Sequence, residues 1–233
     1  LEVIEMDGAW AWQLYFVLIV LQRKPDGGDR DLALITMLSR VWAALRKPLG
    51  QEWCRKKAGF WDAAVAASPA LREAMRRGLL VEAYSVVGVD GVLGLLDVAS
   101  YFATFPLEAL WDKAVALDFP VRVLLLSFGQ YLGPRLVTYE GWLAHPIQPG
   151  RGITAGETQG PNMARAMIYD VLEAYHSRWG LVAPISQWYD DLAAWRGGTQ
   201  RWIAQQFPAS LEDLTGELAA AGFTLASKST LLA

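Results

Sequence analysis

The sequence contains few of the residues that build disulfides or zinc sites. Its 233 residues include one cysteine and two histidines. A single Cys54 cannot form a disulfide within the chain, and it excludes a cluster of thiolates around a metal. His145 and His176 do not have the close spacing of zinc-ligand pairs, so each is expected in a structural or surface position. These absences exclude a disulfide framework and argue against zinc chemistry.

Long hydrophobic runs are also missing. The longest aliphatic and aromatic run covers residues 14–21, which is too short to span a bilayer, so no membrane partner is expected. No secretory leader is recognisable, because no charged start is followed by an apolar stretch and a cleavage site. The chain opens with Leu1 rather than Met and stops soon after Lys228, which is typical of a fragment of a longer reading frame.

An overall excess of positive charge is absent, although basic residues gather in one region. The net charge of −3 differs from that of a chain that is basic throughout. Between residues 40 and 77, however, nine Lys and Arg stand against three acidic residues, a local balance of +6. Such a stretch suits contact with phosphates, and a solvated helical face explains the same charges equally well. The eleven Trp residues indicate core packing or, alternatively, stacking on bases.

The hydrophobic content of 53%, with 19% charged residues, predicts a globular chain of one large domain or two small subdomains. Apolar runs at 12–21 and 32–38 flank a Pro-Asp-Gly-Gly turn and predict a β-hairpin with a basic tip, although residues 32–45 also fit a helix. Further helices are expected over 68–86, 106–117, 121–131, 162–176 and 210–222, and strands over 91–98, 134–143, 185–192, 223–225 and 229–232. The helix at 210–222 would begin at a capping box formed by Ser210 and Asp213. Because helices and strands mix without regular βαβ alternation, the sequence predicts an α+β fold.

Two adjacent carboxylates, Asp190 and Asp191, follow an apolar and aromatic run. Like charges repel, and a divalent cation such as Mg²⁺ is the usual compensation, whereas a solvated turn is the simpler explanation of the dipeptide alone. A two-metal site needs a third carboxylate on a neighbouring strand. Asp97 is the candidate, because it ends the apolar stretch 92–96 and is followed by the aromatic pair Tyr101 and Phe102.

Five motifs occur in order along the chain. They are Arg23-Lys24-Pro-Asp-Gly-Gly-Asp-Arg30, Leu96-Asp97-Val-Ala-Ser-Tyr-Phe102, the loop from Gly152-Ile-Thr-Ala-Gly156 to Gly160-Pro161, Trp188-Tyr-Asp-Asp191, and Gly222-Phe-Thr-Leu-Ala-Ser-Lys228. In this order they resemble the fingers hairpin, the first palm motif, the template-positioning loop, the Tyr-x-Asp-Asp box and the later Gly…Lys motif of a reverse transcriptase. The resemblance is closest to non-LTR retrotransposons and covers residues 12–232. Each motif is weak alone, but the ordered set is specific.

This resemblance implies an α+β polymerase fold of fingers and palm, with helices packed on one face of an antiparallel palm sheet. Residues 1–90 would form a fingers-like subdomain and residues 91–233 the palm, with 106–150 as a helical and strand insertion. The implied activity is RNA-directed DNA polymerisation by two-metal nucleotidyl transfer. Asp97, Asp190 and Asp191 would be catalytic and would hold Mg²⁺, or Mn²⁺ in its place.

The resemblance also implies residues that contact the substrate and its partners. Arg23, Lys24 and Arg30 would contact the triphosphate of a dNTP, and Phe102 would be the aromatic gate that rejects a ribose 2′-hydroxyl. Gly156 belongs to the loop that positions template and nucleotide, and Lys228 would lie near the nucleotide. The implied partners are an RNA template, a DNA primer and a dNTP. Neither the oligomeric state nor the compartment is indicated.

Several positions depart from the family pattern. Asp31 stands where the family has Pro and would place a negative charge near a triphosphate, while Ala155 replaces Gln and Gly160 replaces Ser. Ala103 replaces a frequent second Asp, and Trp188 replaces Tyr. The sequence shows no thumb region after Leu232, and a thumb would be expected in the longer reading frame. These departures favour a divergent lineage or, as the alternative, a catalytically inactive nucleic-acid-binding protein derived from a retroelement; an unrelated α+β protein is the third interpretation.

Overall fold

The chain folds into two compact units, each built from two separate stretches of sequence. The computed structural model describes residues 1–25, 27–64, 70–154 and 156–232. Unit 1 comprises Leu1–Cys54 and Phe102–Met167, and unit 2 comprises Arg55–Tyr101 and Ile168–Ala233. A single division at residue 90, as expected from the sequence, does not coincide with these units. The reason is that strands distant in sequence pair within each unit: 135–139 with 17–23 in unit 1, and 191–198 with 90–97 in unit 2.

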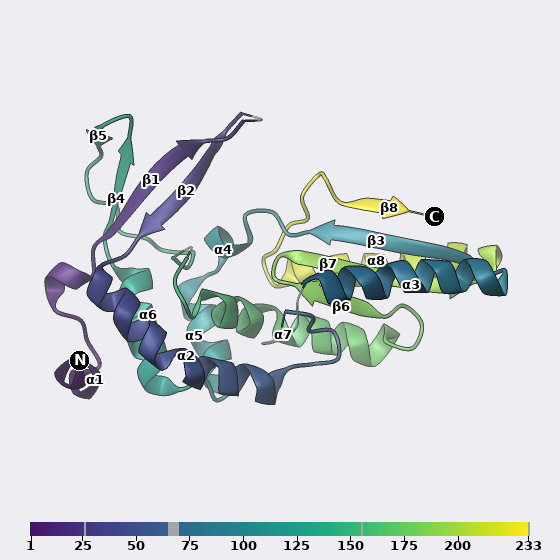
Figure 1. The fold of residues 1–233 in the computed structure, drawn as a ribbon, viewed down its shortest axis with the longest axis horizontal. Helices are drawn as coiled ribbons and strands as arrows, with labels where there is room; N and C mark the ends of the chain where they lie inside the picture. The colour runs from purple at the N-terminus through teal and green to yellow at the C-terminus, as the bar shows by residue number, and fades with distance from the viewer. Residues whose placement is uncertain (26, 65–69, 155, 233) are drawn as a thin grey trace. The chain divides into compact units, whose positions relative to one another are not determined.

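Unit 1 contains a four-stranded sheet in the order β2-β1-β4-β5 (Figure 1). The predicted hairpin is confirmed as β1 (Val17–Arg23) and β2 (Asp29–Leu34), which are antiparallel. Strand β4 (Arg135–Tyr139) lies parallel to β1, and β5 (Trp142–Leu143) folds back on β4. This parallel pairing joins the two stretches of unit 1.

Short helices fill the rest of unit 1. They are α1 (Glu2–Asp7), the 3-10 helix η1 (Trp12–Leu14), α5 (Leu107–Ala116) and α6 (Val121–Leu132). Two longer helices, α2 (Met37–Lys57) and α7 (Gly160–Trp179), begin in unit 1 and end in unit 2, and α4 (Tyr101–Thr104) lies at the boundary. Leu110, Leu124 and Leu126 are fully buried and centre the core on α5 and α6. Among the residues that the structure describes, no helix combines the length and apolar character needed to cross a bilayer.

Unit 2 is built around an antiparallel sheet in the order β6-β7-β3-β8. Its strands are β3 (Asp90–Asp97), β6 (Ile185–Trp188), β7 (Asp191–Gly198) and β8 (Thr230–Leu232). The β3–β7 ladder runs without interruption from Asp90 opposite Gly198 to Asp97 opposite Asp191. Burial alternates along β3, as expected for a strand with one face packed more tightly than the other. The predicted α+β class with an antiparallel sheet is confirmed.

Helices cover both faces of this sheet. Phe207 of α8 (Gln200–Ala220) lies against Gly94, on the face that also carries Leu96. On the opposite face, α3 (Ala70–Val87) places the Tyr84 ring so close to Gly91 that a Cβ there would lie 2.8 Å from the ring. The prediction of helices packed on a sheet face holds for α8, and the structure adds α3 on the other side.

The start of α8 differs from the sequence prediction. The helix begins at Gln200 rather than at Ser210, and the Thr199 side chain accepts the Trp202 backbone N–H at the true start. Ser210 lies fully buried inside the helix, where its hydroxyl donates to the Phe207 carbonyl at 2.7 Å. The capping-box interpretation was therefore wrong, because a Ser followed by an acid three residues later also fits a helix interior.

Gly133 is expected to tolerate no side chain. A Cβ at this position would collide with the backbone carbonyl oxygen of Tyr15, which cannot move aside as a flexible side chain can. We expect Gly133→Ala to lower the free energy of unfolding by about 1–3 kcal/mol. The matched control is Gly78→Ala in α3, where nothing lies within 4 Å of the new Cβ, and a gain of about 0.5–1 kcal/mol is expected. Urea denaturation of both variants measures the difference, and equal effects would contradict the prediction.

Candidate active site

The sheet of unit 2 brings two of the three predicted carboxylates together. Asp97 ends β3 and Asp191 begins β7, and the two residues are cross-strand partners. Directly opposed residues in an antiparallel pair point to the same face, so both side chains share one side of the sheet. Asp190 lies in the two-residue turn before Asp191, and its backbone carbonyl accepts the Val98 N–H at 3.0 Å. The backbone of the third predicted residue is therefore anchored beside the end of β3.

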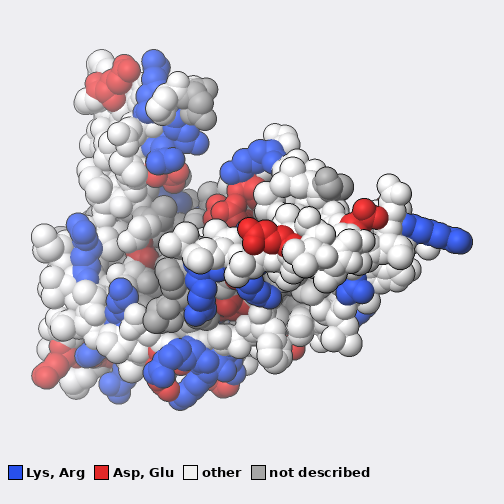
Figure 2. Space-filling model, turned by 45° about the vertical axis from the view of Figure 1, so that its right-hand side comes forward, with Lys and Arg blue, Asp and Glu red and all other residues white. Residues whose placement is uncertain are grey.

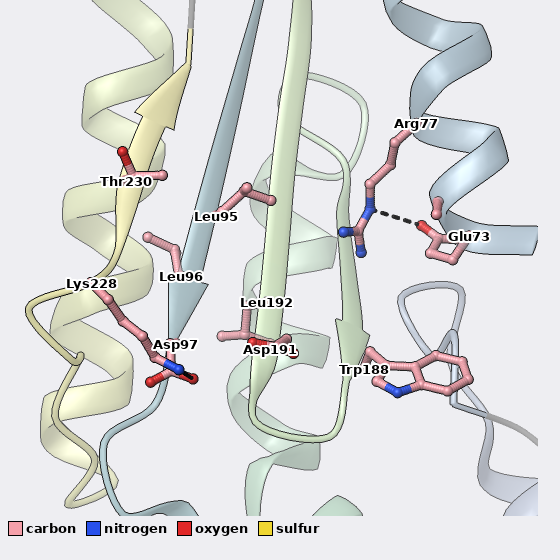
Figure 3. A pocket seen from close by; sticks show the side chains of 11 residues that line it. Glu73, Arg77, Leu95, Leu96, Asp97, Trp188, Asp191, Leu192, Lys228 and Thr230 are labelled. Atoms are coloured by element: carbon pink, nitrogen blue, oxygen red, sulfur yellow. Dashed lines mark ion pairs between the residues drawn. The ribbon is translucent and has the colours of Figure 1, made fainter. Parts of the chain in front are cut away.

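Lys228 lies directly against Asp97. Its Nζ is 2.9 Å from Asp97 Oδ1, and Figure 3 shows the two side chains meeting at the end of β3. The backbone holds this segment in place, because the Asp97 N–H donates to Ser229 Oγ at 3.1 Å and the Ala226 N–H donates to the Asp97 carbonyl at 2.8 Å. The hydrogen bond and charge of Asp97 raise the pKa of Lys228. The two residues thus form an ion pair with an exposed ammonium.

The charges at this end of the sheet act on Asp191. Partial desolvation raises its pKa, and the negative charges of Asp190 and Asp97 raise it further. Lys228 and Arg77 act in the opposite direction. The carboxylates therefore repel one another, and positive charge placed among them would be stabilising.

A pocket of about 360 Å³ opens beside the carboxylates, within the size range of small-molecule sites. Figure 3 shows how its lining is arranged: Asp97, Asp191 and Lys228 lie at one end, Glu73 and Arg77 reach in from α3, and Trp188 forms a side. Leucines of β3 and β7 provide apolar lining: Leu95, Leu96 and Leu192. Acidic, basic, aromatic and apolar groups thus border one cavity.

Asp97 and Asp191 fit a divalent cation by their chemistry, since Mg²⁺ and Mn²⁺ prefer carboxylate oxygens. The two residues oppose each other across the ladder, and the repulsion that contributes to the raised pKa of Asp191 favours a cation near the pair. A third ligand is not assembled: across the described ranges, no group of three or more His, Cys, Asp or Glu side chains is placed to hold a metal. The Lys228 ammonium is the cation in contact with Asp97.

The predicted triphosphate-contacting residues lie in unit 1, on the β1–β2 hairpin. Figure 2 shows basic side chains, in blue, gathered on this hairpin at the upper left. Arg23 is opposite Asp29 and Arg30 is opposite Gln22, so Arg23 and Arg30 project from opposite faces. Arg23 donates to the Tyr139 hydroxyl at 2.9 Å. Lys24 follows β1 directly and is exposed.

Asp31, the departure that was expected near the triphosphate, lies on the face opposite to Arg30. It pairs with Leu21 across the hairpin, which places its side chain on the same face as Arg23. The charge of Asp31 acts on Arg135 of β4, where it opposes the lowering of the arginine pKa by burial. The structure therefore separates Asp31 from Arg30.

Phe102 and the Gly-rich loop are joined within unit 1. The Phe102 carbonyl accepts the Ile153 N–H at 2.9 Å, and the Phe105 carbonyl accepts the Gly152 N–H at 2.8 Å. Gly156 has a φ of 85°, a backbone conformation that favours glycine. The predicted site residues thus form two sets. The carboxylates and Lys228 lie in unit 2, and Arg23, Lys24, Arg30, Phe102 and Gly156 lie in unit 1.

Sequence reasoning did not single out three residues of these regions. Glu73 and Arg77 appeared only as part of a basic stretch, although their spacing of four is that of neighbours on one helix face. Glu157 lies in the Gly-rich loop and is fully buried, where its carboxylate accepts from the Tyr131 hydroxyl at 2.8 Å and from the Gln159 N–H at 2.9 Å. Burial outweighs these bonds and raises its pKa to about 6.

Comparison with known proteins identifies the fold by its backbone. No protein-family model matches the chain, and no curated protein matches its sequence. A telomerase from Candida tropicalis in complex with a fragment of telomeric RNA matches with a TM-score of 0.69, 10% identity, and coverage of 96% of this chain and 42% of the other. The apo telomerase of the same organism, truncated from its C-terminal domain, matches with a TM-score of 0.65 and 11% identity, over 95% of this chain and 51% of the other. Another structure of the apo telomerase from that organism matches with a TM-score of 0.64 and 9% identity, over 92% of this chain and 44% of the other.

The chain therefore spans about half, or less, of the telomerase chains that it matches. At such low identity the similarity concerns the fold alone. It agrees with the predicted α+β fold of an antiparallel sheet with packed helices. The chain has a reverse-transcriptase-like fold.

Proposed function

We propose that this chain is the RNA-directed DNA polymerase region of a retrotransposon-type element, which transfers a nucleotide from a dNTP to a primer 3′-hydroxyl. The observation that carries the proposal is the opposition of Asp97 and Asp191 at the end of the β3–β7 ladder, with Asp190 in the adjoining turn. The reverse-transcriptase-like fold supports it, and the RNA bound to one telomerase neighbour supports an RNA partner. The retrotransposon type rests on the ordered sequence motifs.

The carboxylates of this chain would hold Mg²⁺ or Mn²⁺, which would lower the pKa of the primer hydroxyl and neutralise charge on the triphosphate. Asp97 and Asp191 offer oxygens from one sheet face, and Asp190 offers a further carboxylate from the turn. Lys228 would leave Asp97 and contact a substrate phosphate, because its stem is exposed and its Nζ already lies at the site. Chemistry of this type depends mainly on positioning and electrostatics.

Unit 1 carries the other residues to which the resemblance assigns contacts with the substrate. Arg30 is the better candidate for the triphosphate, because Arg23 is already bonded to Tyr139. Lys24 would assist at the hairpin tip. Phe102 would exclude a nucleotide that carries a ribose 2′-hydroxyl, and the loop that includes Gly156 would position template and nucleotide.

Primer extension tests the proposal directly. The chain is incubated with an RNA template, an annealed DNA primer, dNTPs and Mg²⁺, and then with Mn²⁺. Extension by the wild-type chain is expected, and Asp190→Asn should abolish most of it, because the variant removes one negative charge from the carboxylate group. Full extension by Asp190→Asn would overturn the assignment of the site.

A second candidate is a nucleic-acid-binding protein without polymerase activity. Its specific support is the Lys228–Asp97 contact, which places a protein cation where a metal would otherwise bind. This candidate predicts RNA binding that weakens with salt, as phosphate contacts do, with no incorporation of nucleotides. Incorporation by the wild-type chain would exclude it.

A further inference from the structure

We propose that Arg77 of α3 binds a nucleotide phosphate in the pocket beside Asp97 and Asp191. The inference rests on the proposed function, because that function supplies the ligand. It assigns to α3, which precedes the first carboxylate strand, a binding role in addition to its packing on the sheet. The phosphate belongs either to the incoming dNTP or to the 3′-terminal nucleotide of the primer.

The position of Arg77 is set by the docking of α3 on the carboxylate face. Tyr84, two turns further along the helix, packs on Gly91 and Gly197 of β3 and β7. Arg77 Nη2 donates to Ser186 Oγ of β6 at 3.0 Å. These contacts at separate points of α3 hold the guanidinium in the wall of the pocket that contains Asp97 and Lys228.

The hydrogen-bonding capacity of Arg77 is incompletely used. Its Nε lies 3.6 Å from Glu73 Oε1, which is an ion pair but too long for a hydrogen bond. Both atoms are buried, and neither has a hydrogen-bond partner among the described residues. Arginine carries five N–H donors in a planar fork, so a second acceptor can bind without the loss of Ser186.

Two cations of the pocket lining, Arg77 and Lys228, can donate to an anion with several oxygens, and a divalent cation at Asp97 and Asp191 would offset the carboxylates that border the same pocket. Glu73 is shared between two arginines, since its Oε2 lies 3.4 Å from Arg76 Nη1. Lys228 stands on the opposite side of the same pocket, and Trp188 and leucine side chains supply apolar surface to its lining. A guanidinium binds phosphate in a bidentate manner, and an aromatic ring suits a base or sugar. A nucleotide combines these features.

Arg77→Gln tests the assignment, with Arg76→Gln as the matched control. Both arginines contact Glu73, but Arg76 lies over the Trp195 ring and does not line this pocket. Dissociation constants are measured separately for dATP with Mg²⁺ and for an RNA–DNA template–primer, alongside the melting temperature. We expect Arg77→Gln to weaken one of the two ligands by about 10- to 100-fold, the range of a lost charge-assisted hydrogen bond, while Arg76→Gln changes both by about twofold or less.

The two dissociation constants, for dATP and for the template–primer, identify which ligand supplies the phosphate. Weaker dATP binding with unchanged template–primer binding assigns Arg77 to the incoming nucleotide, and the reverse result assigns it to the primer end. Unchanged binding of both ligands, or equal effects of the two variants, overturns the proposal. If Arg77→Gln does not fold, Arg77→Lys replaces it as the test variant, because lysine retains the charge but loses the planar fork of N–H donors. Wild-type affinity of Arg77→Lys for both ligands would then overturn the proposal.

Failure of the proposed function has a different signature. In that case the wild-type chain extends no primer, and Asp97→Asn changes nothing. The Arg77 assignment alone fails when the wild-type chain extends primers, Asp97→Asn does not, and Arg77→Gln behaves like Arg76→Gln.

Discussion

Asp97→Asn is expected to reduce primer extension by about a thousandfold, the loss typical of a group that stabilises transition-state charge. Asp97 is the carboxylate at the centre of the site: it opposes Asp191 across the ladder and contacts Lys228. An amide keeps the shape of the side chain but removes its negative charge, so divalent cation binding should weaken as well. The variant should fold normally, because both backbone hydrogen bonds of residue 97 remain.

Asp90→Asn is the matched control for this prediction. Asp90 lies on the same strand as Asp97 but at its other end, opposite Gly198, and it is exposed. Steady-state kcat and KM for dNTP, together with Mn²⁺ binding in the absence of nucleotide, should be close to wild type in the control. An Asp97→Asn variant with near wild-type kcat would show that the carboxylate pair has no catalytic role.

Glu157→Gln is expected to stabilise the protein at pH 7.5 and to have a much smaller effect on its stability at pH 4.5. Burial raises the pKa of Glu157 from its ordinary value of 4.5 to about 6 in the folded state. Its contribution to stability is therefore fully present below pH 4.5 and is lost as the pH rises through about 6, because the folded state must then release the proton. The loss amounts to about 2 kcal/mol, and glutamine, which never ionises, avoids it.

Thermal and urea unfolding at a series of pH values from 4.5 to 8 measures this effect. Glutamine can retain both bonds of Glu157, because its amide oxygen can take the place of Oε2, which accepts from both the Tyr131 hydroxyl and the Gln159 N–H. Glu212→Gln, at an exposed position of α8, is the control and should keep the wild-type pH dependence. An identical pH dependence of Glu157→Gln and wild type would contradict the buried, proton-binding state of Glu157.

The carboxylate pair could be predicted from the sequence because its signals are local. The alternating burial of β3 and the position of Asp97 at its end follow from an apolar run that stops at an acid. The turn at Tyr189 and Asp190 was indicated by the Asp190-Asp191 dipeptide, which follows an apolar and aromatic run. Their opposition then requires that the two strands be neighbours, as the family resemblance implied, and that they pair in the observed register.

The docking of α3 on the carboxylate face could not be predicted, because it depends on distant residues. Tyr84 finds room only where Gly91 and Gly197 lie side by side, and nothing in the helix sequence indicates this pairing. Arg77 therefore appeared as one charge in a basic stretch rather than as part of a pocket.

Glu157 and the start of α8 were missed for related reasons. A glutamate in a Gly-rich loop is expected to be exposed to solvent. In the structure Glu157 is buried and accepts a hydrogen bond from the hydroxyl of Tyr131, a buried residue of α6 that is distant in sequence. In α8, Ser210 and Asp213 suggested a helix start, whereas the helix begins at Gln200 and continues through Ser210.

The eight-residue ladder between β3 and β7 has an evolutionary consequence. The spacing of Asp97 and Asp191 depends on backbone register, so replacement of the surrounding side chains leaves the pair in place. A site of this kind can persist while the surrounding sequence diverges. Insertions in the strands, rather than substitutions around them, are the changes that such a lineage would have to avoid.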